Sequence, residues 1–390
     1  MSVSRRSFVK SVGAGGAGAL LAPWITARGQ EALAGEVAAA WPADLATELR
    51  LPAPTAIKLD SNENPNGPCA ASLEAVRSNL LGGSSRYPGR WVEALRQGLA
   101  ASLDLPPENL LPGCGSGEIL RMTVYAFTKP TRPLITGAPS FEDPTHHAAT
   151  IGSPVVAVPV DAQLRLDLAG MAEAARGAGL VFLCNPNNPT ATVHGAGAVQ
   201  DFVARVLRAS PETTVLIDEA YHEYVEDPTY ATAIPLAMEN PRVVVCRTFS
   251  KVHGMAGLRV GYAIGHPETL KAMDRHRLRN AVNVLGASAA LASLAERDHI
   301  ERERQLNREA REFTRRGFEN IGYRVGPSEA NFLMVDVRRD SRDFQAACRR
   351  YDVLVGRPFP PLTTHARISI GTMAEMQLAV EIFRKVLREG

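Results

Sequence analysis

Short runs of apolar, often β-branched residues alternate with longer stretches of helical spacing through the middle of this 390-residue chain. Several runs are apolar throughout, as expected for strands that are buried on both faces of a sheet. Strands that alternate with helices favour an α/β domain whose sheet is mostly parallel. The predicted strands are residues 132–136, 155–160, 180–184, 214–217, 243–246 and 258–264.

The pattern changes after about residue 275, which suggests a second, smaller domain. A long, charged helical stretch is followed by short strands at 331–337, 353–355 and 367–370 and by a final helix from Met373. We therefore expect a small α+β domain at 276–390, because a chain of this length exceeds one ordinary core. The large domain is predicted at 86–275, after an N-terminal arm at 35–85.

The N-terminus resembles a twin-arginine (Tat) export signal. Arg5 and Arg6 precede a mildly apolar, Gly/Ala-rich run at 12–22. Residues 1–34 are predicted to be the signal, with cleavage after Ala34, and the protein is expected in the periplasm. A basic tail on a cytoplasmic protein is the alternative.

Composition excludes several classes of function. Lysine and arginine number 43 against 41 acidic residues, so no broad charge favours nucleic acid or acidic membranes. No apolar run reaches the ~18 residues of a spanning helix. The five cysteines are scattered and none forms C-x-x-C, so we expect free thiols and neither a disulfide framework nor a metal site.

The segment after the strand at 243–246 carries the most chemical information. Lys251 lies among hydroxyls and glycines, with Arg259 eight residues further on. An amine in a dry site can lose its proton and attack an aldehyde. Thr248, Ser250 and Arg259 could hold a phosphate, Arg259 with a planar fork of donors. The alternative is a surface lysine.

Residues 250–262 read Ser-Lys-x-x-Gly-x-Ala-Gly-x-Arg-x-Gly-Tyr. This pattern resembles the cofactor-lysine motif of class I/II aminotransferases of pyridoxal-phosphate (PLP) fold type I, and most closely the histidinol-phosphate aminotransferase-like group. The resemblance extends over about 57–390. It implies a mostly parallel seven-stranded sheet, PLP as the cofactor, and Lys251 as the amine that carries PLP as a Schiff base.

The same resemblance assigns roles around the cofactor ring. Asp218 would pair with the ring nitrogen, while Tyr221 and Asn185 would bond to its phenolic oxygen. Taken alone, Asp218 could be a helix cap and Asn185 part of a tight polar turn. Ala191 departs from the family, which usually has glycine there.

Further roles concern the phosphate and the neighbouring subunit. Ser116 and Gly117 open a helix whose free N–H groups would cradle the phosphate, and Phe141 would stack on the ring. Tyr87 would reach the phosphate of a second subunit, which implies a homodimer with its site at the interface. The alternatives are a simple turn, a core phenylalanine and a tyrosine packed on its own subunit.

Two residues are expected at the substrate. Arg367 could clamp an α-carboxylate with two parallel hydrogen bonds, although an arginine that opens a strand is commonly a surface charge. Asn64 would lie near the same carboxylate. Arg357 is offset by one residue from a second family arginine, so its role stays open.

These residues predict ping-pong transfer of an amino group between an amino acid, with histidinol phosphate as a candidate, and a 2-oxo acid. Lys251 would move the Cα proton as a general acid and base. A decarboxylase, lyase or oxidase on the same fold is the nearest alternative. A non-catalytic binding protein is the other.

Overall fold

The computed structural model describes residues 56–388, so the predicted signal at 1–34 lies outside the described residues. Residues 35–55 of the predicted arm at 35–85 lie outside the described residues as well. No helix within 56–388 is long and apolar enough to cross a membrane.

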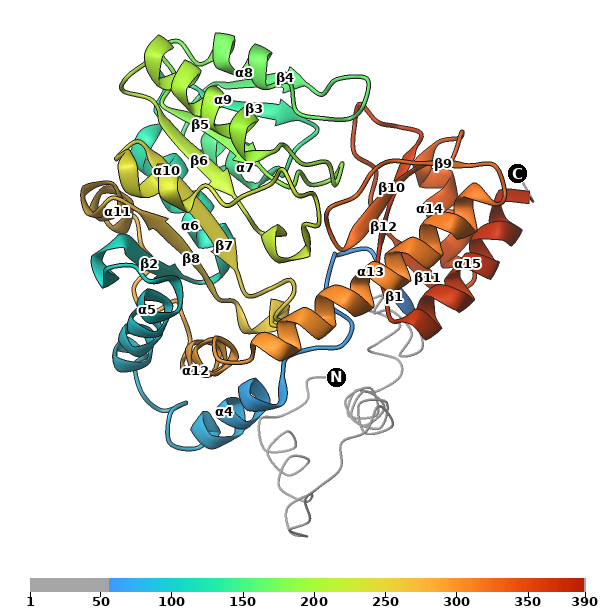
Figure 1. Cartoon of the computed structure of the whole chain (residues 1–390), viewed down its shortest axis with the longest axis horizontal. Coiled ribbons are helices and arrows are strands. Elements are labelled where there is room, and N and C mark those ends of the chain that lie inside the picture. The colour runs from blue at the N-terminus through green and yellow to red at the C-terminus, as the bar shows by residue number, and fades with distance from the viewer. Residues whose placement is uncertain (1–55, 389–390) are drawn as a thin grey trace, which may run out of the picture. The chain divides into compact units, whose positions relative to one another are not determined.

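A seven-stranded sheet organises the large lobe (Figure 1). The strand order is β2-β8-β7-β6-β5-β3-β4, and β8 runs in the direction opposite to the other six strands. The mostly parallel α/β sheet is therefore confirmed. The strands are β2 (Leu110–Gly113), β3 (Leu134–Ala138), β4 (Val155–Pro159), β5 (Leu180–Cys184), β6 (Thr214–Asp218), β7 (Val243–Thr248) and β8 (Gly261–Gly265).

Helices cover both faces of this sheet, as apolar strands require. In β5, Leu180 and Phe182 face one apolar cluster while Val181 and Leu183 face the other. One cluster includes side chains of α5 (Gly89–Leu103), α8 (Leu168–Ala174), α9 (Ala196–Ala209), α10 (Ile234–Glu239) and α12 (Val284–Ser293), with α4 (Ala70–Leu80) packed on α12. The opposite cluster includes α6 (Gly115–Phe127), α7 (Asp143–Thr150) and α11 (Pro267–Asp274).

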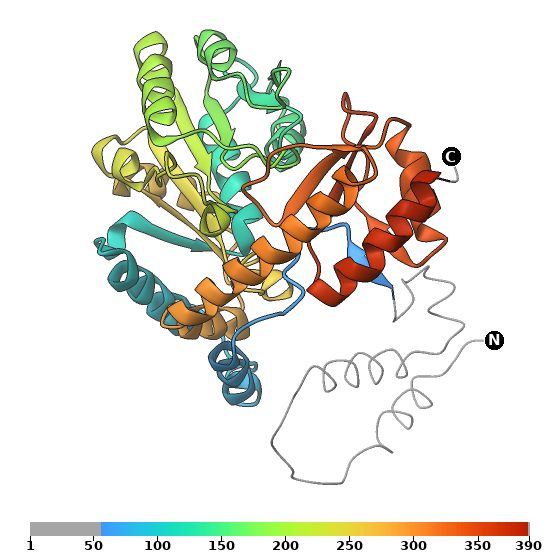
Figure 2. The same ribbon diagram turned by 45° about the vertical axis from the view of Figure 1, so that its right-hand side comes forward.

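The small lobe has its own core. Its antiparallel sheet has the order β12-β10-β9, and β1 pairs in parallel with β11. The elements are β1 (Ile57–Leu59), β9 (Arg324–Val325), β10 (Phe332–Asp336), β11 (Val353–Val355), β12 (His365–Ser369), α13 (Arg297–Glu319), α14 (Ser341–Arg349) and α15 (Met373–Arg388). Figure 2 shows α13 running from the large lobe to this sheet.

Packing groups some segments differently from their order in the chain. Helix α12 follows residue 275 in sequence but packs into the large-lobe core. Strand β1 precedes the large lobe in sequence but pairs with the small lobe. Residues 60–67 therefore cross between the lobes, and residues 60–63 line the cavity between them.

Candidate active site

A cavity of about 670 Å³ lies where β5, β6 and β7 end, between the two lobes. Parallel strands bring their carboxyl ends to one edge of a sheet, where ligands of open α/β folds bind. The predicted residues that line the cavity are Ser116, Gly117, Phe141, Asp218, Tyr221, Thr248, Ser250, Lys251, Arg259 and Arg367.

One end of the cavity is built to receive an anion. Ser116 and Gly117 lie in the first turn of α6, whose free N–H groups point toward its N-terminus. Arg259 packs against this loop, since a Cβ added to Gly115 would lie 2.5 Å from its Nη2. Arg259 Nη1 also lies 3.4 Å from Ser250 Oγ. Together these groups suit a phosphate.

Lys251 presents a partly buried amine to the middle of the cavity. Its Nζ donates to the main-chain oxygen of Asn62 at 3.1 Å and lies 5.4 Å from the centre of the Tyr221 ring. Burial, together with the nearby Arg367 cation, lowers the pKa of Lys251 to about 8. A substantial fraction of the amine is therefore neutral near physiological pH, as a nucleophile or a general base requires.

Asp218 lies on the floor, at the end of β6 and between Cys184 and Cys246 of the neighbouring strands. It is 3% exposed, and burial raises its pKa to about 7. Its Oδ1 accepts from the Ala220 N–H at 3.1 Å, and no salt bridge involves it among residues 56–388. A buried carboxylate without a cation partner suits a protonated ring nitrogen.

Arg367 closes the opposite end of the cavity and is 8% exposed. Its Nη1 donates to Asn188 Oδ1 at 2.8 Å and its Nη2 to the Asp60 carbonyl at 2.6 Å. The guanidinium also lies 4.8 Å from the Phe359 ring centre. Burial lowers the pKa of Arg367 to about 10, so it remains a cation that a carboxylate can pair with.

Arg357 also lines the cavity, so the structure places this residue beside the site. Its guanidinium forms a salt bridge with Glu142, which precedes α7 in the large lobe. Both side chains are exposed at the mouth of the cavity. This pair therefore joins the lobes where a substrate would enter.

Three predicted residues lie elsewhere. Asn185 is buried beside the cavity, but its amide is taken up by the backbone of His194, at 2.8 Å to the N–H and 3.0 Å to the carbonyl. Asn64 lines a separate cavity of about 120 Å³ and bonds to Glu303 and to the Val252 carbonyl. Tyr87 is 83% exposed, so it does not pack on its own subunit.

Two asparagines that the sequence analysis missed take part instead. Asn188, from the same turn as Asn185, lines the cavity and holds Arg367. Asn62, two residues before Asn64, lines it beside Lys251 and Tyr221. Both lie in the predicted motifs, so the structure differs from the prediction only in which asparagine of each motif faces the cavity.

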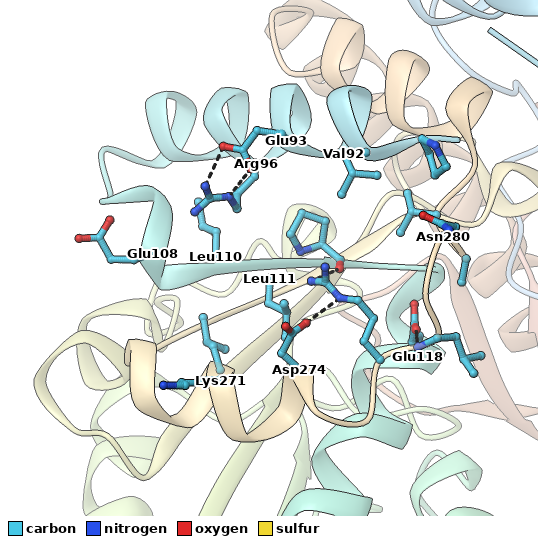
Figure 3. A pocket seen from close by; sticks show the side chains of 18 of the residues that line it. Val92, Glu93, Arg96, Glu108, Leu110, Leu111, Glu118, Lys271, Asp274 and Asn280 are labelled. Carbon is cyan, nitrogen blue, oxygen red and sulfur yellow. Dashed lines mark hydrogen bonds and ion pairs between the residues drawn. The ribbon is translucent and has the colours of Figure 1, made fainter. Parts of the chain in front are cut away.

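A second cavity of about 400 Å³ lies between α5, β2, α11 and residues 274–282 (Figure 3). Its charged side chains largely pair with one another, as in Arg96 with Glu93 and Arg277 with Asp274. Because these charges neutralise one another in pairs, the cavity does not present charge of one sign to a ligand. Within residues 56–388, no cluster of histidine, cysteine and carboxylate side chains could hold a metal ion.

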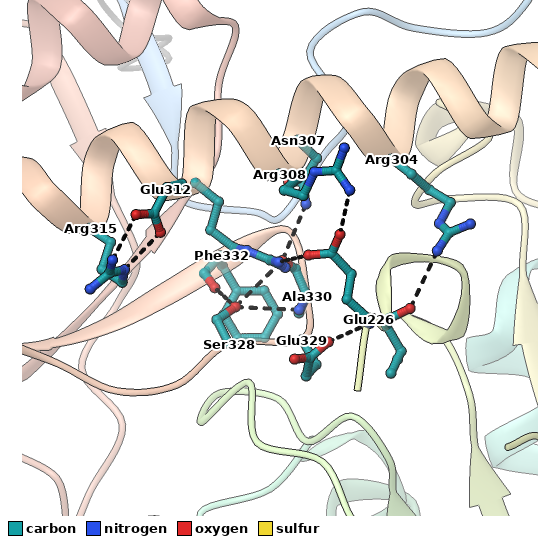
Figure 4. Close-up of polar contacts among 12 residues, drawn as sticks. Glu226, Arg304, Asn307, Arg308, Glu312, Arg315, Ser328, Glu329, Ala330 and Phe332 are labelled. Carbon is teal, nitrogen blue, oxygen red and sulfur yellow. Dashed lines mark hydrogen bonds and ion pairs between the residues drawn. The ribbon is translucent and has the colours of Figure 1, made fainter. Parts of the chain in front are cut away.

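Polar contacts of helix α13 connect the small lobe to the large lobe (Figure 4). Arg308 and Arg311 bind the two carboxylate oxygens of Glu226, which follows β6 and the turn helix η2 (His222–Tyr224) in the large lobe. Arg311 also donates to the Ala330 carbonyl at 2.9 Å, next to β10. One arginine therefore connects both lobes.

Known proteins resemble this chain over nearly all of the described part. The family model for aminotransferase class I and II matches residues 54–383. The chain belongs to this family. It is 40% identical to the histidinol-phosphate aminotransferase of Symbiobacterium thermophilum, over 86% of this chain and 91% of that protein. It is 37% identical to the aromatic amino acid aminotransferase of Mycobacteroides abscessus, over 86% and 96%.

A solved structure agrees with this assignment. The histidinol-phosphate aminotransferase of Sinorhizobium meliloti, crystallised in complex with pyridoxal-5'-phosphate, superimposes with a TM-score of 0.80 at 30% identity, covering 86% of this chain and 91% of that one. The fold type I prediction is confirmed, and this aminotransferase uses PLP as its cofactor. The anion end, Lys251 and Asp218 fit the phosphate, aldehyde and ring nitrogen of PLP.

Bound PLP supplies an aldehyde that accepts amino groups and a ring that withdraws electrons from the bonds at Cα. The aminotransferase itself supplies binding, orientation and proton transfer. Lys251 provides an amine whose proton affinity suits transfer near neutral pH. Asp218 would hold a proton at the ring-nitrogen end, and Arg367 would orient the substrate so that its Cα–H faces the lysine.

Proposed function

We propose that this aminotransferase exchanges amino groups between a range of amino acids and 2-oxo acids. The observation that carries this proposal is the buried guanidinium of Arg367, which lines the same cavity as Lys251. A planar fork of donors at that place suits an α-carboxylate. Phe141 and Phe359 line the cavity too, which favours donors with apolar or aromatic side chains.

The names of the relatives leave the donor open. Histidinol-phosphate aminotransferases at 40% and 36% identity stand beside aromatic amino acid aminotransferases at 37% and 35%. Histidinol phosphate carries a phosphate where an amino acid carries its carboxylate. Arg357 could serve such a larger anion if it left Glu142.

A half-reaction screen tests the proposal. Holoenzyme is mixed with single amino donors, and the cofactor absorbance is followed without any 2-oxo acid. We expect aromatic amino acids and glutamate to convert the cofactor faster than histidinol phosphate. Conversion by histidinol phosphate alone would show a dedicated enzyme and refute the broad specificity.

We also propose that the functional unit is a homodimer. Tyr87 is 83% exposed, and Leu81, near it in the chain, is 89% exposed, which favours burial against a second copy. Light scattering of the holoenzyme should give twice the monomer mass. Tyr87→Phe should weaken PLP binding without dissociating the dimer, and a monomeric holoenzyme of full activity would contradict the proposal.

Export by the twin-arginine route is proposed from the sequence pattern at residues 1–34. Fusion of these residues to a reporter that is active only outside the cytoplasm tests it. Replacing Arg5 and Arg6 together by lysine should abolish export. Retention of the unaltered fusion in the cytoplasm would refute the export.

A further inference from the structure

Asn62 lies where the Lys251 loop, the end of β6 and the small lobe meet. It is 1% exposed, and its backbone is left-handed, with φ of 53°. Asparagine is among the few non-glycine residues that tolerate this conformation. The segment around it is pressed on the lysine loop, since a Cβ on Gly254 would lie 2.1 Å from the Gly67 carbonyl oxygen.

The orientation of the Asn62 side chain is fixed by Ser369 of β12. Ser369 Oγ accepts from the Asn62 main-chain N–H at 2.8 Å, and its hydroxyl donates to Asn62 Oδ1, also at 2.8 Å. The amide oxygen thus faces Ser369, where it accepts the single hydroxyl proton. The amide nitrogen therefore faces the opposite side.

On that side the amide nitrogen donates to the phenol oxygen of Tyr221 at 3.1 Å. This oxygen is thereby an acceptor toward Asn62, so its own O–H is directed elsewhere, and Tyr221 lines the cavity. Burial raises the pKa of Tyr221, so the phenol keeps its proton to donate. The Asn62 amide thus decides the direction in which Tyr221 donates.

The main chain of Asn62 performs a second task. Its carbonyl oxygen accepts from Lys251 Nζ at 3.1 Å and from Asn331 Nδ2 at 3.0 Å. Asn331 precedes β10, so the small lobe holds this carbonyl in place. This oxygen accepts a hydrogen bond from the lysine amine whenever that amine is not bonded to the cofactor.

We propose that Asn62 is a positioning residue for transamination. Its amide aims the Tyr221 hydroxyl into the cofactor cavity, and its carbonyl holds the free Lys251 amine over the same cavity. The Asn62 side chain thereby aligns Tyr221, which is 159 residues away in the sequence, and the Asn62 carbonyl aligns Lys251, which is 189 residues away.

Two variants change the amide and leave the main-chain carbonyl in place. Asn62→Gly keeps the left-handed backbone and the carbonyl but removes the amide. Asn62→Asp keeps the shape but replaces the donor by an acceptor, which draws the Tyr221 hydroxyl away from the cavity. Asp104→Gly is the control, because it also removes a polar side chain from a left-handed position, with φ of 54°, but is exposed and outside the cavity.

The first readouts are kcat, KM and the pH at which the absorbance of bound PLP changes. We expect kcat to fall about 10-fold in Asn62→Gly with KM within about twofold, as for an interaction used in the reaction rather than in binding. In Asn62→Asp, kcat should fall at least about 30-fold, which corresponds to roughly 2 kcal/mol, and the pKa of the spectral change should move by about one unit. Asp104→Gly should match the wild type in all three.

The second readout is made on the apoenzyme. The pH dependence of Lys251 acylation should be unchanged in Asn62→Gly, because the carbonyl is retained. The proposal is overturned if both variants keep the wild-type kcat and spectral pKa. It is equally overturned if Asn62→Gly loses PLP affinity and thermal stability while its spectral pKa stays at the wild-type value, since that result shows a purely structural role.

Discussion

Glu219, the residue after Asp218, forms a buried ion pair with Arg247 of β7. Removing the Glu219 carboxylate should therefore lower the free energy of unfolding considerably. Arg247 donates to Glu219 Oε2 from Nε at 3.0 Å and from Nη2 at 2.8 Å. The Ala233 N–H and the Thr232 hydroxyl donate to the same carboxylate. The side chains are 1% and 6% exposed, so water cannot replace the lost contacts.

Glu219→Gln leaves the Arg247 cation buried and places an NH₂ group where donors converge. Breaking one partner of a buried pair costs about 3–5 kcal/mol. Unfolding entropy is about 2.1 cal/mol/K per residue, or roughly 0.7 kcal/mol/K over residues 56–388, so the melting temperature should fall by about 4–7 °C. Differential scanning calorimetry of the apoenzyme measures this shift.

The control is Glu212→Gln, which breaks an ion pair of similar length with Arg242. Those side chains are 75% and 35% exposed, so the expected change is below about 1 kcal/mol. Melting temperatures within about 1 °C of each other for the two variants would refute the argument from burial.

Three further predictions concern the site. Acylation of Lys251 in the apoenzyme should be half-maximal near pH 8 and rise with pH, because only the neutral amine reacts; a midpoint near that of ordinary lysines would contradict the burial argument. Arg367→Lys should lower kcat/KM for amino acid donors by roughly 30- to 1000-fold, because a point charge replaces the fork; steady-state kinetics showing less than a fivefold loss would argue against a carboxylate clamp. Gly254→Ala should lower the free energy of unfolding by at least about 3 kcal/mol and reduce the PLP content, because its Cβ would collide with the Gly67 carbonyl. Gly177→Ala, with a similar φ and open space around it, should lower the free energy of unfolding by about 1 kcal/mol. Thermal melting measures both changes.

Local sequence was sufficient for much of the fold and for one half of the site. The strands of the large lobe were predicted because buried parallel strands are apolar on both faces. Strand β2 was missed, since its four residues, Leu110–Gly113, include proline and glycine. Lys251, Ser250 and Arg259 belong to one continuous segment, so their spacing alone brought them together.

Tertiary structure decided which members of a motif face the cavity. Asn185 and Asn188 lie three residues apart in one turn, and only the folded turn directs Asn188 inward and Asn185 to the His194 backbone. Asn62 and Asn64 differ in the same way, because a left-handed residue at 62 changes the direction of the chain.

The sequence by itself determined the cofactor-lysine segment, because Ser250, Lys251 and Arg259 lie in one short stretch that follows β7. Only the tertiary structure decided the substrate end. There, Arg367 meets Asp60 across 307 residues and Asn188 across 179. Such contacts depend on how the two lobes pack, and no local spacing encodes that packing.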